Sequence, residues 1–293
     1  MTRVFRQSLL RFLPTVLLAI VLACRGSGDR AQLLIGGYGD QRSPAWMTDG
    51  KRIVCSSARA GYPAHLYLCD LETGTSRPLT NAPYGDNCPA VSPNGQWVAF
   101  HSDRAGQSDI YRLDLATSEI VRLTSSPYND RFPTWSPDGK RIAFHSEAAG
   151  DPDIWLMDFD GANKIPLVMQ PGMDTTSAWS PDGKKIAFSS EASGNPDIWQ
   201  IYLADRRMLR LTRTADSEWK PVWSPDGRQI VYCRGRRGGP ARLWIMNPDG
   251  THQRPLSSAG NWDDFDSAWS PDGLRLAFEC NRNGHFDIWA IRF

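Results

Sequence analysis

The chain has 293 residues, 41% of them hydrophobic and 22% charged, and its formal net charge is +1. This composition is ordinary for a globular protein and ample for a sizeable core. The even charge balance excludes a strongly basic surface for a polyanion, so we do not expect nucleic acid as a partner. The 25 Gly, 21 Pro and 12 Trp residues favour many turns and an all-β architecture.

The first 23 residues differ from the rest of the chain. Three arginines occur within the first eleven residues, and an uncharged, mainly apolar stretch follows from Phe12 to Ala23. This stretch is short for a bilayer span, so it predicts a secretory signal at 1–23. Without the signal segment, acidic residues outnumber basic residues by two.

The signal segment ends in Val21-Leu22-Ala23-Cys24, which resembles a bacterial lipobox. We therefore expect lipidation at Cys24, with residues 24–30 forming a lipidated tether. A lipobox cysteine carries more than one acyl chain, which favours stable anchoring to a membrane. The alternative is ordinary cleavage near Ala23, with Cys24 incidental. The predicted location is the periplasm or cell envelope.

A glycine turn recurs six times, at intervals of 44 to 46 residues. The turns read Thr48-Asp49-Gly50, Pro93-Asn94-Gly95, and Pro-Asp-Gly at 137–139, 181–183, 225–227 and 271–273. Proline presets φ, aspartate bonds to nearby backbone, and glycine takes the left-handed conformation that closes a hairpin. A period near 44 residues is typical of a four-stranded propeller blade.

Each repeat contains four candidate strands. In the third repeat they lie at 133–136, 140–144, 153–158 and 165–168, and they are nearly apolar on both faces. Such strands suit a blade that packs between two neighbouring blades. The sequence therefore predicts a single all-β domain at 31–293, a six-bladed β-propeller with four-stranded blades.

The sixth repeat ends at Phe293, after its third strand, whereas residues 33–35 precede the first turn without a blade of their own. An unpaired sheet edge in a ring is a liability. We therefore expect the last blade to be closed by the N-terminal strand, with residues 33–35 as its outer strand.

The six turn repeats resemble the Tol-Pal-type propeller repeat of the TolB-like family, over essentially all of 31–293. The resemblance implies a binding role in the periplasm rather than catalysis. Two departures are expected: no α/β domain precedes the propeller, and the chain is acylated. The function predicted from the resemblance is a non-catalytic envelope scaffold that binds a protein or peptide partner, with a monomer as the expected state. The alternative is a carbohydrate-active enzyme or sugar-binding propeller that resembles oligogalacturonate lyase.

An acidic residue recurs five positions before the tryptophan of the turn motif. It is expected where the chain enters the innermost strand, at the mouth of the central channel, with aromatic residues nearby. The candidate binding residues are Asp86, Asp130, Asp174, Glu218 and Asp264, with Tyr84, Tyr128 and Trp262 beside them. Such a ring would attract a cation or a basic peptide, and aromatic anchors beside charges are typical of protein-binding surfaces. The alternative is that each acid caps its own turn.

Other residues carry weaker signals. Neither a nucleophile elbow nor a phosphate loop occurs, so no catalytic residue and no cofactor is predicted, although the channel leaves room for a cation.

His101 and His145 each lie six residues after the turn glycine, in adjacent repeats. This spacing indicates either a two-histidine metal site or half-buried strand residues. Cys55 and Cys69 fall on neighbouring strands, either bridged or as buried thiols.

A second acid recurs at the start of the third strand of four repeats, at Asp109, Asp153, Asp197 and Asp287. An acid at such a position is expected to bond to neighbouring backbone and to hold the loop before the strand. We therefore interpret these four residues as structural.

Overall fold

The computed structural model describes residues 31–37, 39–59, 62–236 and 238–293. The predicted signal segment at 1–23, the lipidation site at Cys24 and the tether at 24–30 lie outside these ranges and stay predictions. Regular secondary structure within the described ranges consists of β-strands. No helix in these ranges is long and apolar enough to cross a membrane.

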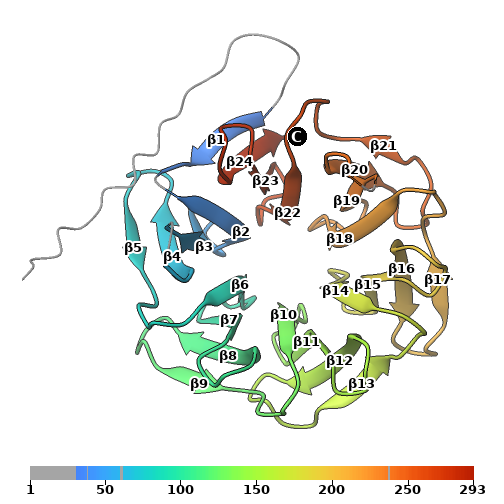
Figure 1. Ribbon diagram of the computed structural model, residues 1–293, viewed down its shortest axis with the longest axis horizontal. Coiled ribbons are helices and arrows are strands. Elements are labelled where there is room, and N and C mark those ends of the chain that lie inside the picture. Colours follow the sequence, from blue (N-terminus) through green and yellow to red (C-terminus); the bar gives the residue numbers. More distant parts are fainter. Residues whose placement is uncertain (1–30, 38, 60–61, 237) are drawn as a thin grey trace, which may run out of the picture.

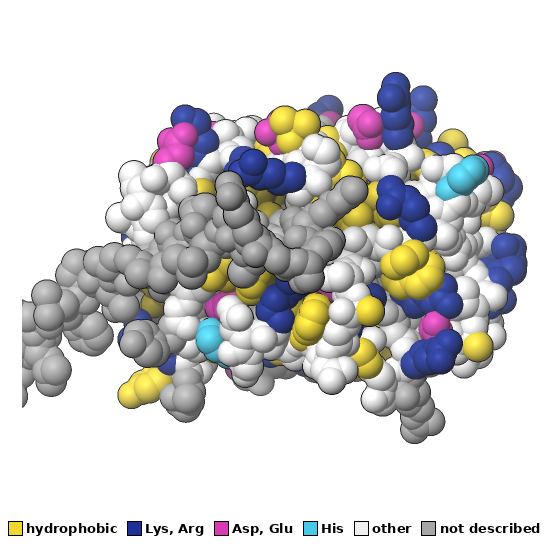
Figure 2. All heavy atoms as spheres, turned by 90° about the horizontal axis from the view of Figure 1, so that it is seen from above, with side chains coloured by type: hydrophobic (Ala, Val, Ile, Leu, Met, Phe, Trp, Pro, Cys, Tyr) yellow, Lys and Arg dark blue, Asp and Glu magenta, His cyan; other side chains and the backbone are white. Residues whose placement is uncertain are grey.

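Twenty-four strands form six antiparallel four-stranded sheets, arranged as blades around a central axis (Figure 1). Blades 1 to 5 each run from the innermost strand to the outermost in chain order. This arrangement confirms the predicted six-bladed propeller. Basic and acidic side chains are interspersed over the part of the rim that Figure 2 shows.

The strand bounds are as follows. Blade 1 comprises β2 (Asp40–Trp46), β3 (Arg52–Ala58), β4 (His65–Asp70) and β5 (Ser76–Pro78); blade 2 comprises β6 (Asp86–Val91), β7 (Trp97–Ser102), β8 (Asp109–Asp114) and β9 (Ile120–Arg122); blade 3 comprises β10 (Asp130–Trp135), β11 (Arg141–Ser146), β12 (Asp153–Asp158) and β13 (Ile165–Val168). Blade 4 comprises β14 (Asp174–Trp179), β15 (Lys185–Ser190), β16 (Asp197–Tyr202) and β17 (Met208–Arg210); blade 5 comprises β18 (Ser217–Trp223), β19 (Ile230–Gly235), β20 (Arg242–Met246) and β21 (Arg254–Pro255); blade 6 comprises β22 (Asp264–Trp269), β23 (Arg275–Cys280), β24 (Asp287–Arg292) and β1 (Ala31–Ile35).

The last blade is closed by the N-terminal strand. β1 pairs antiparallel with β24, with Leu33 opposite Trp289. Ile35 is 2% exposed and packs with Trp46 and Ile53 of blade 1. The predicted closure is confirmed, and β1 also contributes to the core between the first and last blades.

The turn repeat fixes each inner hairpin and joins it to the neighbouring blade. In blade 3, Ser136 Oγ donates to Asp138 at 2.6 Å, and Gly139 closes the turn at φ 69°. The motif residue Trp135 packs against Ile110 of blade 2, and its Nε1 donates to the Ala90 carbonyl at 3.0 Å. The core therefore lies between blades, which explains strands that are apolar on both faces.

Candidate functional site: the central channel

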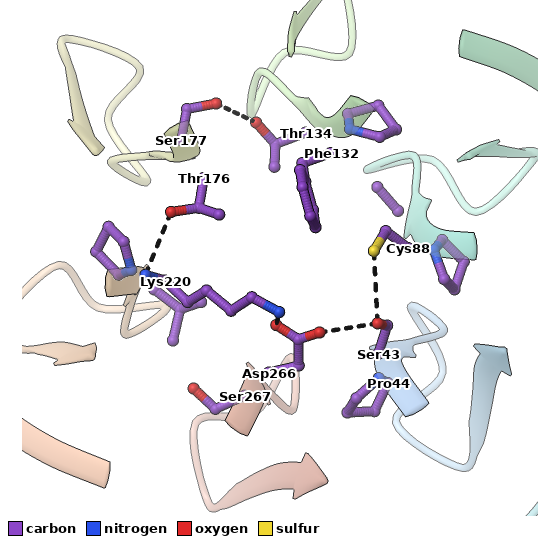
Figure 3. A pocket seen from close by; sticks show the side chains of 15 residues that line it. Ser43, Pro44, Cys88, Phe132, Thr134, Thr176, Ser177, Lys220, Asp266 and Ser267 are labelled. Carbon is purple, nitrogen blue, oxygen red and sulfur yellow. Dashed lines mark hydrogen bonds and ion pairs between the residues drawn. The ribbon is translucent and has the colours of Figure 1, made fainter. Parts of the chain in front are cut away.

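A β-bulge interrupts the ladder between the inner strand and the second strand of every blade. One residue at each bulge has a left-handed backbone: Ser43 (φ 50°), Cys88 (50°), Phe132 (53°), Thr176 (49°), Lys220 (54°) and Asp266 (33°). We call these six residues the channel ring. All six line one cavity of about 150 Å³ on the propeller axis (Figure 3).

The residue after each member of the channel ring suits a bulge. It is proline at Pro44, Pro89, Pro133 and Pro221, and serine at Ser177 and Ser267. Proline has no N–H, so it fits where the ladder is already broken. A left-handed backbone is uncommon outside glycine, and for a β-branched residue such as Thr176 it is an outlier. Backbone strain of this kind clusters at binding sites.

One side of the channel ring is polar. The Lys220 ammonium pairs with Asp266 Oδ1, and Asp266 Oδ2 accepts a hydrogen bond from Ser43 Oγ at 2.9 Å. Cys88 Sγ lies 3.5 Å from the same hydroxyl (Figure 3). Burial acts to lower the pKa of Lys220, but Asp266, Cys88 and Glu279 together outweigh it and raise that pKa. Lys220 therefore stays charged, and the pair forms a fixed dipole across blades 5 and 6.

The other side of the channel ring is apolar. The Phe132 ring lies between two imidazoles, 5.5 Å from His101 and 4.9 Å from His145. Burial, reinforced by Arg131, lowers the pKa of His101 to about 3 and that of His145 to about 4. Both histidines are therefore neutral at pH 7. Within the described ranges, no cluster of three or more His, Cys, Asp or Glu residues is suited to hold a metal ion.

Glu279 lies directly behind the channel ring, at the position that corresponds to the two histidines. It is 3% exposed, and its Oε2 accepts the Ser43 N–H at 3.1 Å. Arg42 lies 3.7 Å from Oε1. Burial, together with the charge of Asp266, raises the pKa of Glu279 to about 8. The channel wall therefore contains a carboxyl group that holds its proton more tightly than it would in water.

The five predicted acids do not form an open ring at the channel mouth. Asp86, Asp130, Asp174, Glu218 and Asp264 begin the inner strands and are at most 2% exposed. Four of them accept local hydrogen bonds: Arg104 to Asp86 at 2.6 Å, Ser126 to Asp130 at 3.4 Å, the Gln170 N–H to Asp174 at 2.9 Å, and Thr214 to Glu218. Asp264 instead forms an ion pair with Arg282 at 3.6 Å. A buried carboxylate needs such partners because it has lost its hydration. The alternative of local capping describes their geometry.

The predicted aromatic residues differ in exposure. Tyr84 and Tyr128 are 44% and 47% exposed on the loops that lead into β6 and β10. Trp262 is half-buried, with the Arg242 and Arg282 guanidinium groups 5.5 and 4.9 Å from its ring centroid. The two tyrosines are thus available to a partner, whereas Trp262 is held by its neighbours.

Sequence reasoning missed the channel ring, although a signal for it existed. Each member lies two positions after the recurring acid, or after Gln41 in the first repeat, and directly before proline or serine. Its residue type differs in every repeat. A periodic position that changes chemistry at each repeat while its neighbours stay similar is a candidate for ligand contact.

The two predicted partner cysteines lie close together as free thiols. Cys55 and Cys69 are buried, and their sulfur atoms are 3.8 Å apart. Of the two alternatives left by the sequence, the structure shows buried thiols.

This geometry defines a class of protein: a six-bladed β-propeller with an asymmetric channel ring. The chain belongs to the TolB beta propeller domain family, whose model matches residues 23–170 and 164–293.

Solved structures show the same fold. TolB from Acinetobacter baumannii is 31% identical over 76% of this chain, with a TM-score of 0.66. A putative TolB from Agrobacterium tumefaciens is 22% identical, with 91% of this chain and 99% of that chain covered and a TM-score of 0.71. An oligogalacturonate lyase in complex with manganese is 15% identical, with 92% and 94% covered and a TM-score of 0.64.

The chain spans only part of some relatives. It covers 55% of the A. baumannii TolB chain. A curated relative, an uncharacterized peptidase YuxL of Bacillus subtilis, is 40% identical over 63 residues, which make up 21% of this chain and 10% of that protein. The matches therefore establish the propeller and its family, and the activities of the whole relatives are not carried over to this chain.

Proposed function

We propose that this protein is a non-catalytic binding scaffold of the cell envelope, anchored by a lipid at Cys24, that binds a protein or peptide partner at the channel ring. One observation carries the proposal: six strained residues, one from each blade, converge on a single cavity and differ in chemistry. The family membership supports the scaffold role.

The asymmetry of the channel ring favours a role in binding a partner over a purely structural role. A ring that only sealed the axis could repeat one small residue six times. Here a cation, an acid, a thiol, two hydroxyls and a phenyl ring each occupy one position. The Lys220–Asp266 pair and the Phe132 ring could therefore fix the orientation of an inserted side chain, while exposed Tyr84 and Tyr128 offer anchors beside the channel.

Crosslinking in the native host followed by mass spectrometry tests this role. The test variant is Lys220→Met with Asp266→Asn, which removes both charges together and leaves no unpaired buried charge. The control is Leu274→Ser, since Leu274 is 57% exposed at the turn between β22 and β23 and does not line the channel cavity.

We expect the wild type and the control to recover the same partner, and the double variant to recover about tenfold less of it, as for loss of one interface anchor. Equal recovery with a folded double variant would refute binding at the channel ring. Depolymerisation of an acidic polysaccharide by the purified protein would instead support the enzymatic alternative.

A further inference from the structure

The six junctions between neighbouring blades, which we call seams, share one backbone contact. The N–H of the first or second residue of each inner strand donates to the carbonyl just before the third strand of the preceding blade. For blades 2 and 3 this is Asp130 to Ser108 at 2.7 Å, and for blades 3 and 4 it is Asp174 to Pro152 at 2.7 Å. The seams can therefore be compared position by position.

At the seam of blades 2 and 3, a buried aspartate is satisfied from the outer strand. Asp109 is fully buried, and it accepts from Arg122 Nη2 at 2.7 Å and from Thr124 Oγ1 at 3.2 Å. The same Thr124 hydroxyl accepts the Ile110 N–H at 2.9 Å. One cation and one hydroxyl thus balance the carboxylate.

The seam of blades 4 and 5 repeats this arrangement. Arg210 lies 2.7 Å from Asp197, and Thr212 Oγ1 lies 3.4 Å from the same carboxylate. Thr212 also donates to Glu218 at 3.2 Å. Arginine at this register position and threonine two residues later therefore form a unit that recurs in the fold.

The seam of blades 3 and 4 lacks both parts of this unit. Pro166 lies opposite Trp155, where Arg122 lies opposite Tyr111 in blade 2, and Val168 takes the place of threonine. Asp153 is 4% exposed, and its carboxylate forms no side-chain hydrogen bond or ion pair with the described residues. Two buried carboxylates therefore meet here without a cation.

Asp174, the second acid of this seam, is fully buried, and its Oδ1 has no hydrogen-bond partner. Its Oδ2 accepts the Gln170 N–H at 2.9 Å. Burial, with the charges of Asp174 and Asp151, raises the pKa of Asp153 to about 6. Every charged group that influences Asp153 here is thus an acid.

The other described seams avoid such a pair. His65 replaces the third-strand acid at blades 1 and 2, Arg242 replaces it at blades 5 and 6, and Gln41 replaces the inner-strand acid at blades 6 and 1. Blades 2 and 3 also bring two buried acids together, Asp109 and Asp130, but Arg122 pairs with the first of them. Among the seams that the structure describes, two buried acids without any paired cation occur at blades 3 and 4 (β12 to β14 in Figure 1).

The cation position of this unit lies near the surface in blade 2. In blade 2 the Arg122 side chain is 36% exposed while its head group covers Asp109. In blade 3 the loop between β13 and β14 follows Val168 directly and carries Met169 and Met173, which are 56% and 43% exposed. Exposed methionines are typical of surfaces that adapt to a partner.

We propose that this seam binds an arginine side chain of a partner protein, which supplies in trans the guanidinium that Arg122 and Arg210 supply in cis. Arginine fits better than lysine because its planar fork matches a carboxylate. Apolar residues next to that arginine would pack on Met169 and Met173. This inference takes one point from the proposed function, which is that the partner is a protein.

Calorimetric titration of the purified protein tests the seam. The probes are the peptide acetyl-Leu-Arg-Leu-amide and its citrulline counterpart, which keeps the shape and removes the charge. We expect the arginine peptide to bind the wild type at least about tenfold more tightly than the citrulline peptide, in line with a charged hydrogen bond. Asp153→Asn should abolish this preference.

A second variant supplies the missing guanidinium from the chain itself. Pro166→Arg with Val168→Thr restores the unit of blade 2, so it should abolish binding of the arginine peptide while the ring stays folded. The control Leu274→Ser should bind as the wild type does.

Equal affinity for the two peptides, or binding that survives Pro166→Arg with Val168→Thr, would overturn the proposal and leave the seam as a proton-binding site only. The channel-ring variants leave the seam intact. Loss of crosslinking in those variants therefore reports on the proposed function separately.

Discussion

Glu279 shows how the ring changes the chemistry of a single carboxyl group. Its side chain is enclosed behind Ser43, near the negative charge of Asp266. The charges of Lys220 and of Arg42, whose guanidinium is 3.7 Å away, compensate only in part. The native state therefore binds the proton of Glu279 more tightly than the unfolded chain does. Folding and protonation of this group are linked.

The linkage predicts how stability depends on pH. Because the native pKa of Glu279 is raised from 4.5 to about 8, its favourable contribution is complete below about pH 4.5 and is lost as the pH rises towards 8. Glu279→Gln cannot titrate, so between pH 5 and pH 8 it should lose about 3.5 kcal/mol less unfolding free energy than the wild type. Urea unfolding at both pH values measures this difference.

Glu72→Gln is the matched control for this measurement, because the Glu72 side chain is 62% exposed. It should lose stability with pH as the wild type does. Parallel pH profiles for the wild type and Glu279→Gln would show that Glu279 titrates normally in the folded ring.

At the scale of the strand, a short outer strand stabilises two blades at once. In blade 4, Thr212 follows β17, and its hydroxyl accepts the Ile198 N–H at 2.8 Å from its own blade. The same hydroxyl lies 3.2 Å from Glu218 of blade 5. The strand end therefore satisfies polar groups on both sides of a seam, which explains why a three-residue outer strand suffices.

Thr212→Val should separate this polar role from packing, because valine has nearly the same shape. The substitution leaves a buried N–H and two carboxylates without their hydroxyl partner, so we expect a loss of about 1–3 kcal/mol in unfolding free energy. Denaturant unfolding at pH 7 measures the loss.

Thr251→Val is the control for the threonine substitution, since Thr251 bonds Asp249 in an exposed turn. It should cost less than about 0.5 kcal/mol. A similar cost at both positions would mean that the seam hydroxyl contributes no more than a surface hydroxyl. Val168 already occupies this position in blade 3, where Asp153 lacks a partner.

At the scale of the molecule, the sequence predicted what is periodic. The turn glycines and the apolar strands specified six blades, and the missing outer strand of the last repeat specified closure by residues 33–35, which the structure extends to Ala31–Ile35. The direction of the side chains at the bulge was not predictable from spacing. The register shift between Asn87 and Ala90 turns Cys88 to the channel, while Asp86 points into the seam. The residues predicted to line the channel were therefore two positions before the residues that do line it.

Ring closure is a property of the whole molecule, because it depends on one short strand at the far end of the chain. β1 supplies Ala31 to the core shared with blade 5 and Ile35 to the core shared with blade 1. Without β1, the edge of β24 and both of these cores would be exposed to water. The loss therefore reaches three blades instead of one.

Deletion of residues 31–36 should lower the unfolding free energy by several kcal/mol, at least about 3, because removal of one fully buried isoleucine side chain alone costs 2–5 kcal/mol. Thermal and urea unfolding of the purified proteins measure it. The matched control removes residues 25–30 and keeps β1, and it should melt as the parent does. If the shorter chain without β1 also melts like the parent, the ring does not depend on the N-terminal strand, and the contacts of β1 with blades 1, 5 and 6 carry no net stability.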